Sequence, residues 1–133
     1  MAVTRRMYQL VAVATLGCAA LAAAPAAKHT HLERSEPGAD STITVAPTAI
    51  KLWFSGPVQV RVTTVRVMGA DSTPVALSAA RMGTGTGAPV ILDVHGTVAP
   101  GRYSVAWRTM SRDGHAVSGT FAFTLAAPGT PAQ

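Results

Sequence analysis

The sequence predicts an all-β domain, a two-sheet antiparallel β-sandwich of about seven short strands. Short segments that alternate apolar and polar residues recur along the chain, and turns rich in glycine, proline and aspartate separate them. No segment shows the apolar spacing and capping residues of a long amphipathic helix. Without an N-terminal leader the 133-residue chain retains about 105 residues, which is enough to bury one core.

The first expected strands lie in the N-terminal half of the domain. Ala49–Phe54 places its apolar residues on one face and ends before Gly56–Pro57. Arg61–Met68 is rich in β-branched residues, which favour strands. The turn residues of Gly69–Pro74 then separate it from a brief strand at Val75–Leu77.

The second half begins with a glycine-rich loop at Arg81–Pro89, which we expect to be flexible. Val90–Gly96 is the next predicted strand, and a tight turn at Ala99–Gly101 follows it. Two longer strands complete the fold, at Arg102–Met110 and Ala116–Leu125. Both alternate apolar with small polar residues, as half-buried strands do.

These elements predict one sandwich domain over residues 28–126, with 127–133 as a flexible tail. The apolar positions of the expected strands share the inner faces of the two sheets. The residues that we expect to be largely buried are Leu52, Phe54, Val65, Val105, Trp107, Phe121 and Phe123.

Residues 1–27 are expected to form a secretory signal peptide. Arg5 and Arg6 precede the apolar run Leu10–Ala27, which ends in small residues. An uncleaved membrane anchor is the alternative, because this run could just span a bilayer. The start also partly resembles a twin-arginine export signal. Cys18 is the only cysteine, so cleavage would leave a domain without a disulfide or a thiolate metal site.

The charge distribution argues against a nucleic-acid partner. The formal net charge of the whole chain is +5. Removal of the leader, with Arg5 and Arg6, would lower it to +3. The remaining basic residues are scattered, and no cluster of aromatic residues accompanies them. We therefore expect a mildly basic surface and no binding to nucleic acids.

Histidine and aspartate are the residues that could support chemistry. His29 and His31 lie near the start of the expected domain, and Asp113 and His115 are separated only by Gly114. Residues two apart point to the same face of a strand, so each pair could converge on one ion. Such nitrogen and oxygen donors suit Cu(II), Zn(II) or Ni(II).

The segment around Asp113 has two interpretations from spacing alone. Strict alternation would point His115 into the core, so we expect the last strand to begin after His115, with Gly114 supplying a bend. Alternatively, "RDGH" is a plain hairpin turn whose Asp-Gly serves backbone geometry. His95 is expected to be solvated. Neither a nucleophile triad nor a carboxylate pair for glycoside chemistry is evident, which favours binding over catalysis.

The chain resembles the CopC family of periplasmic copper-binding proteins along most of its length. The resemblance rests on three segments: "HTHLERSEPGAD", "AIKLWFSGPV" and "APGRYSVAWRTMSRDGHAVSGTFAFTL". The third is the most specific, because the family repeats the pattern W-x-x-x-S-x-D-G-H-x-x-x-G-x-F-x-F there. The residues that fit this pattern are Trp107, Ser111, Asp113, Gly114, His115, Gly119, Phe121 and Phe123.

The resemblance implies a Greek-key sandwich related to immunoglobulin and cupredoxin folds, and a Cu(II) site. The ligands that it implies are His29, Asp113 and His115, with the free N-terminal amine, and His31 is a reserve ligand. Lys28 departs from the family pattern, in which cleavage leaves the first histidine as the N-terminus. The family's methionine-rich Cu(I) site is not expected here, because the methionines of the expected domain, Met68, Met82 and Met110, are dispersed.

The function implied is that of an exported, periplasmic protein, soluble after cleavage and not an enzyme. It would sequester or carry copper in copper homeostasis and resistance, with delivery to an inner-membrane copper transporter as a further step. Two alternatives stay open: a copper-dependent oxidative enzyme with an N-terminal histidine brace, and a metal-free immunoglobulin-like binding module.

Overall fold

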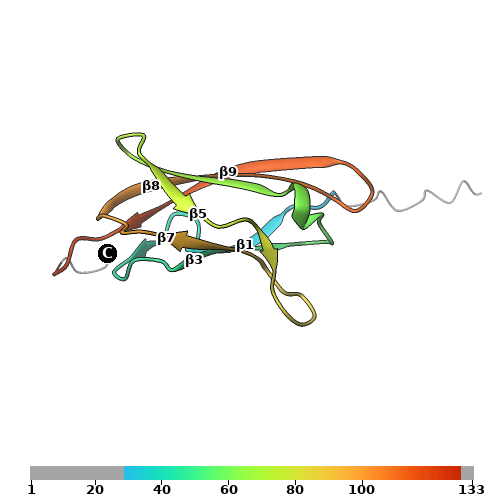
Figure 1. Cartoon of the computed structure of the whole chain (residues 1–133), viewed down its shortest axis with the longest axis horizontal. Coiled ribbons are helices and arrows are strands. Elements are labelled where there is room, and N and C mark those ends of the chain that lie inside the picture. The colour runs from blue at the N-terminus through green and yellow to red at the C-terminus, as the bar shows by residue number, and fades with distance from the viewer. Residues whose placement is uncertain (1–28, 130–133) are drawn as a thin grey trace, which may run out of the picture.

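The computed structural model describes residues 29–129 (Figure 1). The expected signal peptide, Lys28 and the last residues of the expected tail, 130–133, lie outside the described residues. Among the described residues no helix is long and apolar enough to cross a membrane. The predicted all-β class is confirmed, since the elements are strands apart from one 3₁₀ turn, η1 (Val60–Val62).

The strands form one continuous hydrogen-bonded path in the order β1-β3-β7-β5-β4-β8-β9-β2, and β6 pairs with β7 beside this path. The strands and their bounds are β1 (Leu32–Glu36), β2 (Thr42–Ile43), β3 (Ala49–Phe54), β4 (Thr64–Gly69), β5 (Pro74–Leu77), β6 (Arg81–Met82), β7 (Val90–His95), β8 (Gly101–Met110) and β9 (Ala116–Leu125).

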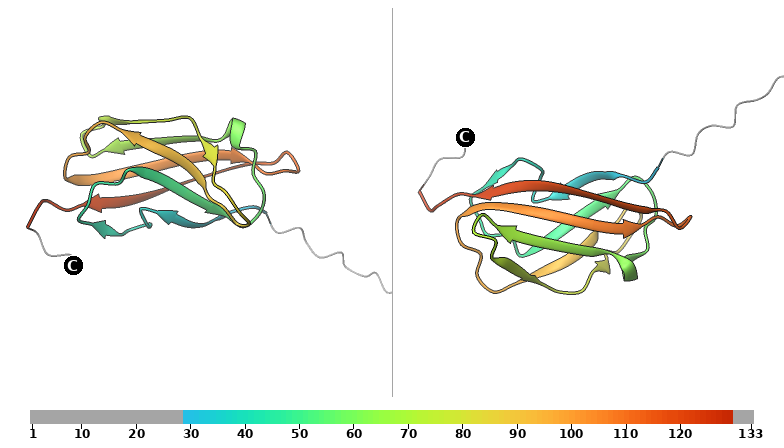
Figure 2. Two further views of the ribbon diagram at one scale, coloured as in Figure 1. Left: turned by 60° about the horizontal axis from the view of Figure 1, so that its bottom comes forward. Right: turned by 90° about the horizontal axis from the view of Figure 1, so that it is seen from above.

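Strand β5 turns this path into a sandwich. It pairs with β4 on one side and with β7 on the other, so the sheet curls over on itself. One layer contains β1, β3 and β7, and the other contains β4, β8 and β9, as Figures 1 and 2 show. The predicted two-layer sandwich is therefore confirmed.

The hairpin of β8 and β9 is the longest element of the fold, with continuous pairing from Gly101–Leu125 to Met110–Ala116. Its alternation points Tyr103, Val105 and Trp107 inward, and Val105 and Trp107 are buried as predicted. Opposite Trp107 lies Gly119, where an added Cβ would come within 2.7 Å of the indole Cζ2. A side chain at this position would therefore displace the indole ring or the strand.

The inner faces of the two layers form one core. Of the predicted core residues, four are buried: Leu52, Val105, Trp107 and Phe123. The other three, Phe54, Val65 and Phe121, are partly buried and pack against the core. Burying one such side chain stabilises the fold by about 1.5–3 kcal/mol. The further buried hydrophobic residues are Ile50, Val67, Val90, Leu92, Val98, Tyr103 and Leu125.

The strand predicted at Arg61–Met68 starts three residues later in the structure. Val60–Val62 is a 3₁₀ turn, and β4 starts at Thr64. The cause is a local side-chain bond: the Thr63 hydroxyl donates to the carbonyl of Gln59 at 3.0 Å and lies 2.7 Å from the Thr109 hydroxyl. Such bonds compete with strand pairing, and they outweigh the β-branched composition here.

The described part of the chain contains nine strands, against about seven expected, and six of the nine coincide with the six segments predicted as strands. The additional strands are β1, β2 and β6, and none shows clear alternation of apolar residues. Strand β6 lies in the loop that was expected to be flexible, where the Arg81 guanidinium donates to the Asp93 carboxylate at 3.0 Å. Strand β2 pairs with β9 in parallel, so the sandwich is not wholly antiparallel.

Candidate metal centre

Three segments that are distant in sequence meet at one end of the sandwich. They are the start of the described chain, the loop that follows β3, and the turn between β8 and β9. Two hydrogen bonds join His31 and Ser55. The His31 N–H donates to the Ser55 hydroxyl at 3.0 Å, and the Ser55 N–H donates to the His31 carbonyl at 2.9 Å. In the same loop, the Pro57 carbonyl accepts a hydrogen bond of 3.2 Å from the Arg112 backbone N–H. The loop after β3 therefore connects the other two segments.

The β8–β9 turn has a defined backbone structure. The Ser111 N–H donates to the His115 carbonyl at 2.9 Å, and the Gly114 N–H donates to the Ser111 carbonyl at 3.0 Å. Gly114 has a φ of 90°, which a residue with a side chain rarely adopts. Strand β9 begins at Ala116, so the predicted bend before the strand is confirmed. "RDGH" is a hairpin turn, and this turn brings Asp113 and His115 into contact.

The Asp113 carboxylate is bonded through both of its oxygens. Oδ2 lies 2.9 Å from His115 Nδ1, while Oδ1 accepts from the Ser111 hydroxyl and from the His115 backbone N–H. These bonds, with that from Ser111 the strongest cause, hold the pKa of Asp113 well below its usual range. The side chains of Asp113 and His115 are 62% and 68% exposed. The turn therefore presents an ionised carboxylate and an imidazole to solvent.

Ser111 anchors this pair from beneath. It is buried, with 5% of its surface exposed, and its hydroxyl also lies 3.1 Å from the His115 carbonyl. The Gln59 side-chain amide donates to the Ser111 carbonyl at 3.2 Å. The spacing of the sequence pattern included Ser111 but did not reveal this role, and it gave no signal for Ser55 or Gln59, whose importance arises only from the fold.

His29 lies opposite the pair. Its ring centroid is 6.2 Å from that of His115, and the two rings are perpendicular. Both histidines are exposed. The structure therefore places His29 beside the contacting Asp113–His115 pair. Among residues 29–129 no three histidine, cysteine, aspartate or glutamate side chains are close enough to form a completed metal site. The arrangement is a contacting pair with a third donor nearby.

The other candidate donors, His31, His95 and the methionines, make different contacts or lie on other strands. His31 Nδ1 donates to the His29 carbonyl at 3.2 Å, and the residue lines a shallow hollow over Trp107 and Gly119. His95 is exposed at the end of β7, where it pairs with Ala76. The three methionines of the expected domain lie on three different strands: Met68 on β4, Met82 on β6 and Met110 on β8.

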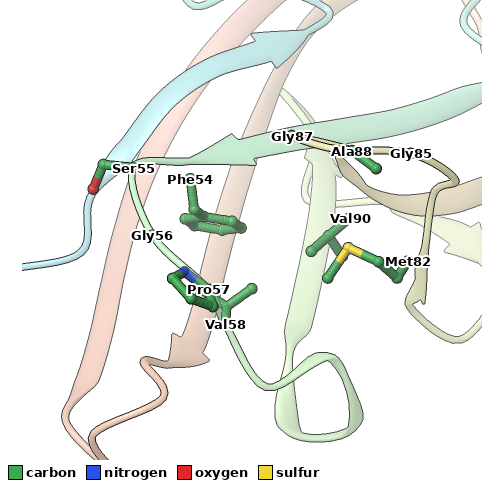
Figure 3. A pocket seen from close by; sticks show the side chains of 10 residues that line it. All are labelled: Phe54, Ser55, Gly56, Pro57, Val58, Met82, Gly85, Gly87, Ala88 and Val90. Carbon is green, nitrogen blue, oxygen red and sulfur yellow. The ribbon is translucent and has the colours of Figure 1, made fainter.

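A separate apolar pocket of about 400 Å³ lies beside the end of β3 (Figure 3). Phe54, Val58 and Val90 line it together with Met82, and Figure 3 shows these side chains grouped around the same space. No titratable side chain lines this pocket. The pocket therefore offers no histidine or carboxylate ligand to a metal ion.

Comparison with known proteins identifies the family. The model of the CopC domain matches residues 32–126. This chain belongs to the CopC family. The matched region includes Asp113 and His115 and begins three residues after His29. The family predicted from the sequence pattern is confirmed.

Individual relatives agree with this assignment. Protein YobA of Escherichia coli K12 is 29% identical over 97 residues, which cover 73% of this chain and 78% of YobA. The crystal structure of CopC from Methylosinus trichosporium OB3b has a TM-score of 0.68 at 26% identity, covering 77% of this chain and 99% of that one. PcoC, a methionine-rich copper resistance protein from Escherichia coli, has a TM-score of 0.64 at 30% identity, covering 74% and 99%. The chain therefore belongs to a family of copper-resistance proteins.

Proposed function

We propose that this protein is an exported Cu(II)-binding protein that sequesters or carries copper without catalysing a reaction. Its ligands are His29, Asp113 and His115. The observation that carries this proposal is the meeting of His29, from the start of the described chain, with the Asp113–His115 pair in the β8–β9 turn. The family and the copper-resistance relative PcoC support copper as the ion.

The donor set fits Cu(II). This ion prefers tetragonal nitrogen and oxygen ligands, and the two imidazoles and the carboxylate supply them. A free N-terminal amine, produced by cleavage of residues 1–27, supplies a further nitrogen. Asp113 is ionised through its bonds to Ser111 and His115, so it offers charge without first losing a proton. The imidazoles must be neutral to bind.

The dispersed methionines favour Cu(II) over Cu(I). Cu(I) is selected by soft thioether and thiolate ligands, which must converge on the ion. Met68, Met82 and Met110 lie on separate strands, unlike a methionine-rich cluster. Met82 is 46% exposed, and it lines the apolar pocket rather than the histidine site.

Export and delivery complete the proposal. The leader at residues 1–27 directs the protein out of the cytoplasm, into the periplasm. The exposure of Asp113 and His115 supports transfer, because an exposed ion can pass to an acceptor without unfolding of the carrier. An inner-membrane copper transporter is the proposed acceptor.

A competition titration of Cu(II) against the purified exported protein tests the ligands. We expect His29→Ala and His115→Ala each to weaken binding at least tenfold, which corresponds to about 1.4 kcal/mol. His95→Ala is the matched control, since His95 is also exposed but lies on β7. Equal losses in the control, or none in the two site variants, would contradict the proposed ligands.

The proposed role also excludes catalysis. Under air and a reductant, the copper-loaded protein should form hydrogen peroxide no faster than the same amount of copper in a simple amino-acid chelate. Faster, protein-dependent formation would instead support the oxidative enzyme. Loss of all copper on desalting would support the metal-free binding module.

A further inference from the structure

The outward face of the β4–β8–β9 layer carries arginines and small residues. Alternation along these strands buries one set of side chains and exposes the other. We call the outward set the arginine face. Its members are Thr64, Arg66, Met68, Arg102, Ser104, Ala106, Arg108, Met110, Ala116, Ser118, Thr120, Ala122 and Thr124. None of these side chains is acidic.

The three arginines of this face are exposed and have no carboxylate partner among the described residues. The nearby acidic residues lie at the margins. Asp71 is in the turn after β4, Asp113 is in the β8–β9 turn, and the backbone N–H of Asp40 donates to Ala122 at the edge of β9. The positive charge of the face is therefore uncompensated at its centre.

In the opposite layer, Arg34, Lys51 and Arg81 each have a carboxylate partner. Arg34 and Lys51 both lie against Glu36, at 3.4 and 3.5 Å, and Arg81 lies 3.0 Å from Asp93. The two layers thus present similar numbers of cations, but on the β1–β3–β7 side two carboxylates offset most of the charge of the three cations. The difference between the two layers lies in how the charged residues are arranged on the surface, and the net charge of the chain does not reveal it.

The arginine face is open and has short side chains between its arginines. In the right-hand view of Figure 2, β9, β8 and β4 lie side by side, and no other described segment crosses in front of them. Arg108 is flanked in the sheet by Thr64 and Ser118, while Arg66 pairs with Ala106. A broad surface could therefore approach all three guanidinium groups together.

We propose that the arginine face binds to the surface of an anionic phospholipid bilayer. Protein interfaces are also enriched in arginine, but their binding energy centres on buried aromatic side chains packed in pockets, and the arginine face has no aromatic side chain. Basic residues near an anionic membrane instead contribute through charge alone, and they attract phosphate groups without a matching shape. A broad face with three uncompensated arginines fits the second kind of partner.

This orientation would leave the histidine site accessible. Asp113 and His115 lie in the turn at the end of β8 and β9, not on the arginine face itself. A molecule resting on this face would therefore hold the turn beside the membrane surface rather than beneath the protein. The inference goes beyond the proposed copper function and does not depend on it.

Co-sedimentation with vesicles tests the inference without copper. The purified exported protein should bind vesicles of equal parts phosphatidylglycerol and phosphatidylcholine at low salt, and should bind vesicles of phosphatidylcholine alone weakly. Replacing Arg66, Arg102 and Arg108 together by glutamine should reduce binding by about fivefold per residue, on the order of a hundredfold in all. Salt should also weaken binding, because surface charges are screened over about 10 Å at 0.1 M.

The matched control removes the same number of charges from the other layer, as Arg34→Gln, Lys51→Gln and Arg81→Gln. This variant should retain most of its binding, while circular dichroism shows that both variants are folded. Equal losses in the two variants would mean that net charge alone is responsible and would overturn the proposal. Equal binding to neutral vesicles, or binding to soluble polyglutamate but not to vesicles, would also overturn it.

Discussion

The two halves of the candidate metal centre are built differently. The Asp113–His115 half lies in a short turn whose backbone bonds, buried Ser111 and glycine at a positive φ define its shape. The His29 half precedes β1, and the described bonds near it pass through the backbone and ring of His31. One half is preorganised by the hairpin, while the other is positioned only through its neighbour. This difference indicates that the turn sets the site and that the N-terminal segment completes it.

The largest expected effect tests the hairpin that supports the turn. Gly119→Ala would place a Cβ 2.7 Å from the Trp107 indole, so the ring or the strand must shift. We expect a loss of about 1–3 kcal/mol in the free energy of unfolding, as for other overpacked cores. Urea denaturation followed by Trp fluorescence measures it.

Gly38→Ala is the control for this substitution, because its nearest atoms would lie 3.7 Å from the new Cβ. Its stability should change by less than about 0.5 kcal/mol. If both variants were equally stable, the close packing of Trp107 on β9 would not support the hairpin.

The next prediction concerns the carboxylate of the preorganised half. Asp113→Asn keeps the shape of the side chain but removes its charge, so Cu(II) affinity should fall tenfold or more. A competition titration gives the affinity. Unchanged affinity would show that the Asp113 carboxylate is not a ligand and that "RDGH" serves only as a hairpin turn.

The third prediction concerns protonation and the N-terminal half. Imidazoles ordinarily titrate near pH 6.5 and a free α-amine near about pH 8, and both must be neutral to bind. Asp113, whose pKa is lowered, stays ionised as the pH falls through this range. Copper affinity should therefore fall as the pH falls, because the nitrogens rather than the carboxylate gain protons.

Acetylation of the N-terminus separates the amine from the imidazoles. The acetylated protein should bind Cu(II) more weakly and with a changed absorption spectrum, while its circular dichroism stays the same. The same affinity and spectrum after acetylation would show that the amine is not a ligand, and the site would then consist of side chains alone.

The smallest expected effect concerns the anchor beneath the turn. Ser111→Ala removes the buried hydroxyl that donates to Asp113, but it leaves every proposed ligand in place. Cu(II) affinity should fall by only a few fold. The Cu(II) electron paramagnetic resonance spectrum should broaden, because the carboxylate is less constrained. An unchanged spectrum and affinity would show that the turn backbone alone positions Asp113.

Local patterns predicted the central strands well. The bounds of β3 and β9 match their predicted bounds, and those of β8 differ by one residue, because alternation and turn residues act over short distances. The edge strands β1 and β2 escaped prediction, since edge strands need no apolar alternation. At Val60–Val62 the Thr63 hydroxyl bond to Gln59 replaced the strand that β-branched residues favoured.

The sequence by itself determined the all-β class, the family, the long hairpin and the candidate ligands, because each depends on local alternation or on a short motif. The tertiary structure decided which candidates meet. It brought His29 to within 6.2 Å of His115 between ring centroids, separated His95 from them, and placed Ser55 and Gln59 between the segments. Within residues 29–129 it also left Arg66, Arg102 and Arg108 without a carboxylate partner, while Arg34, Lys51 and Arg81 each have one. These are distances between segments far apart in the chain, and they depend on strand pairing, which local sequence patterns do not specify.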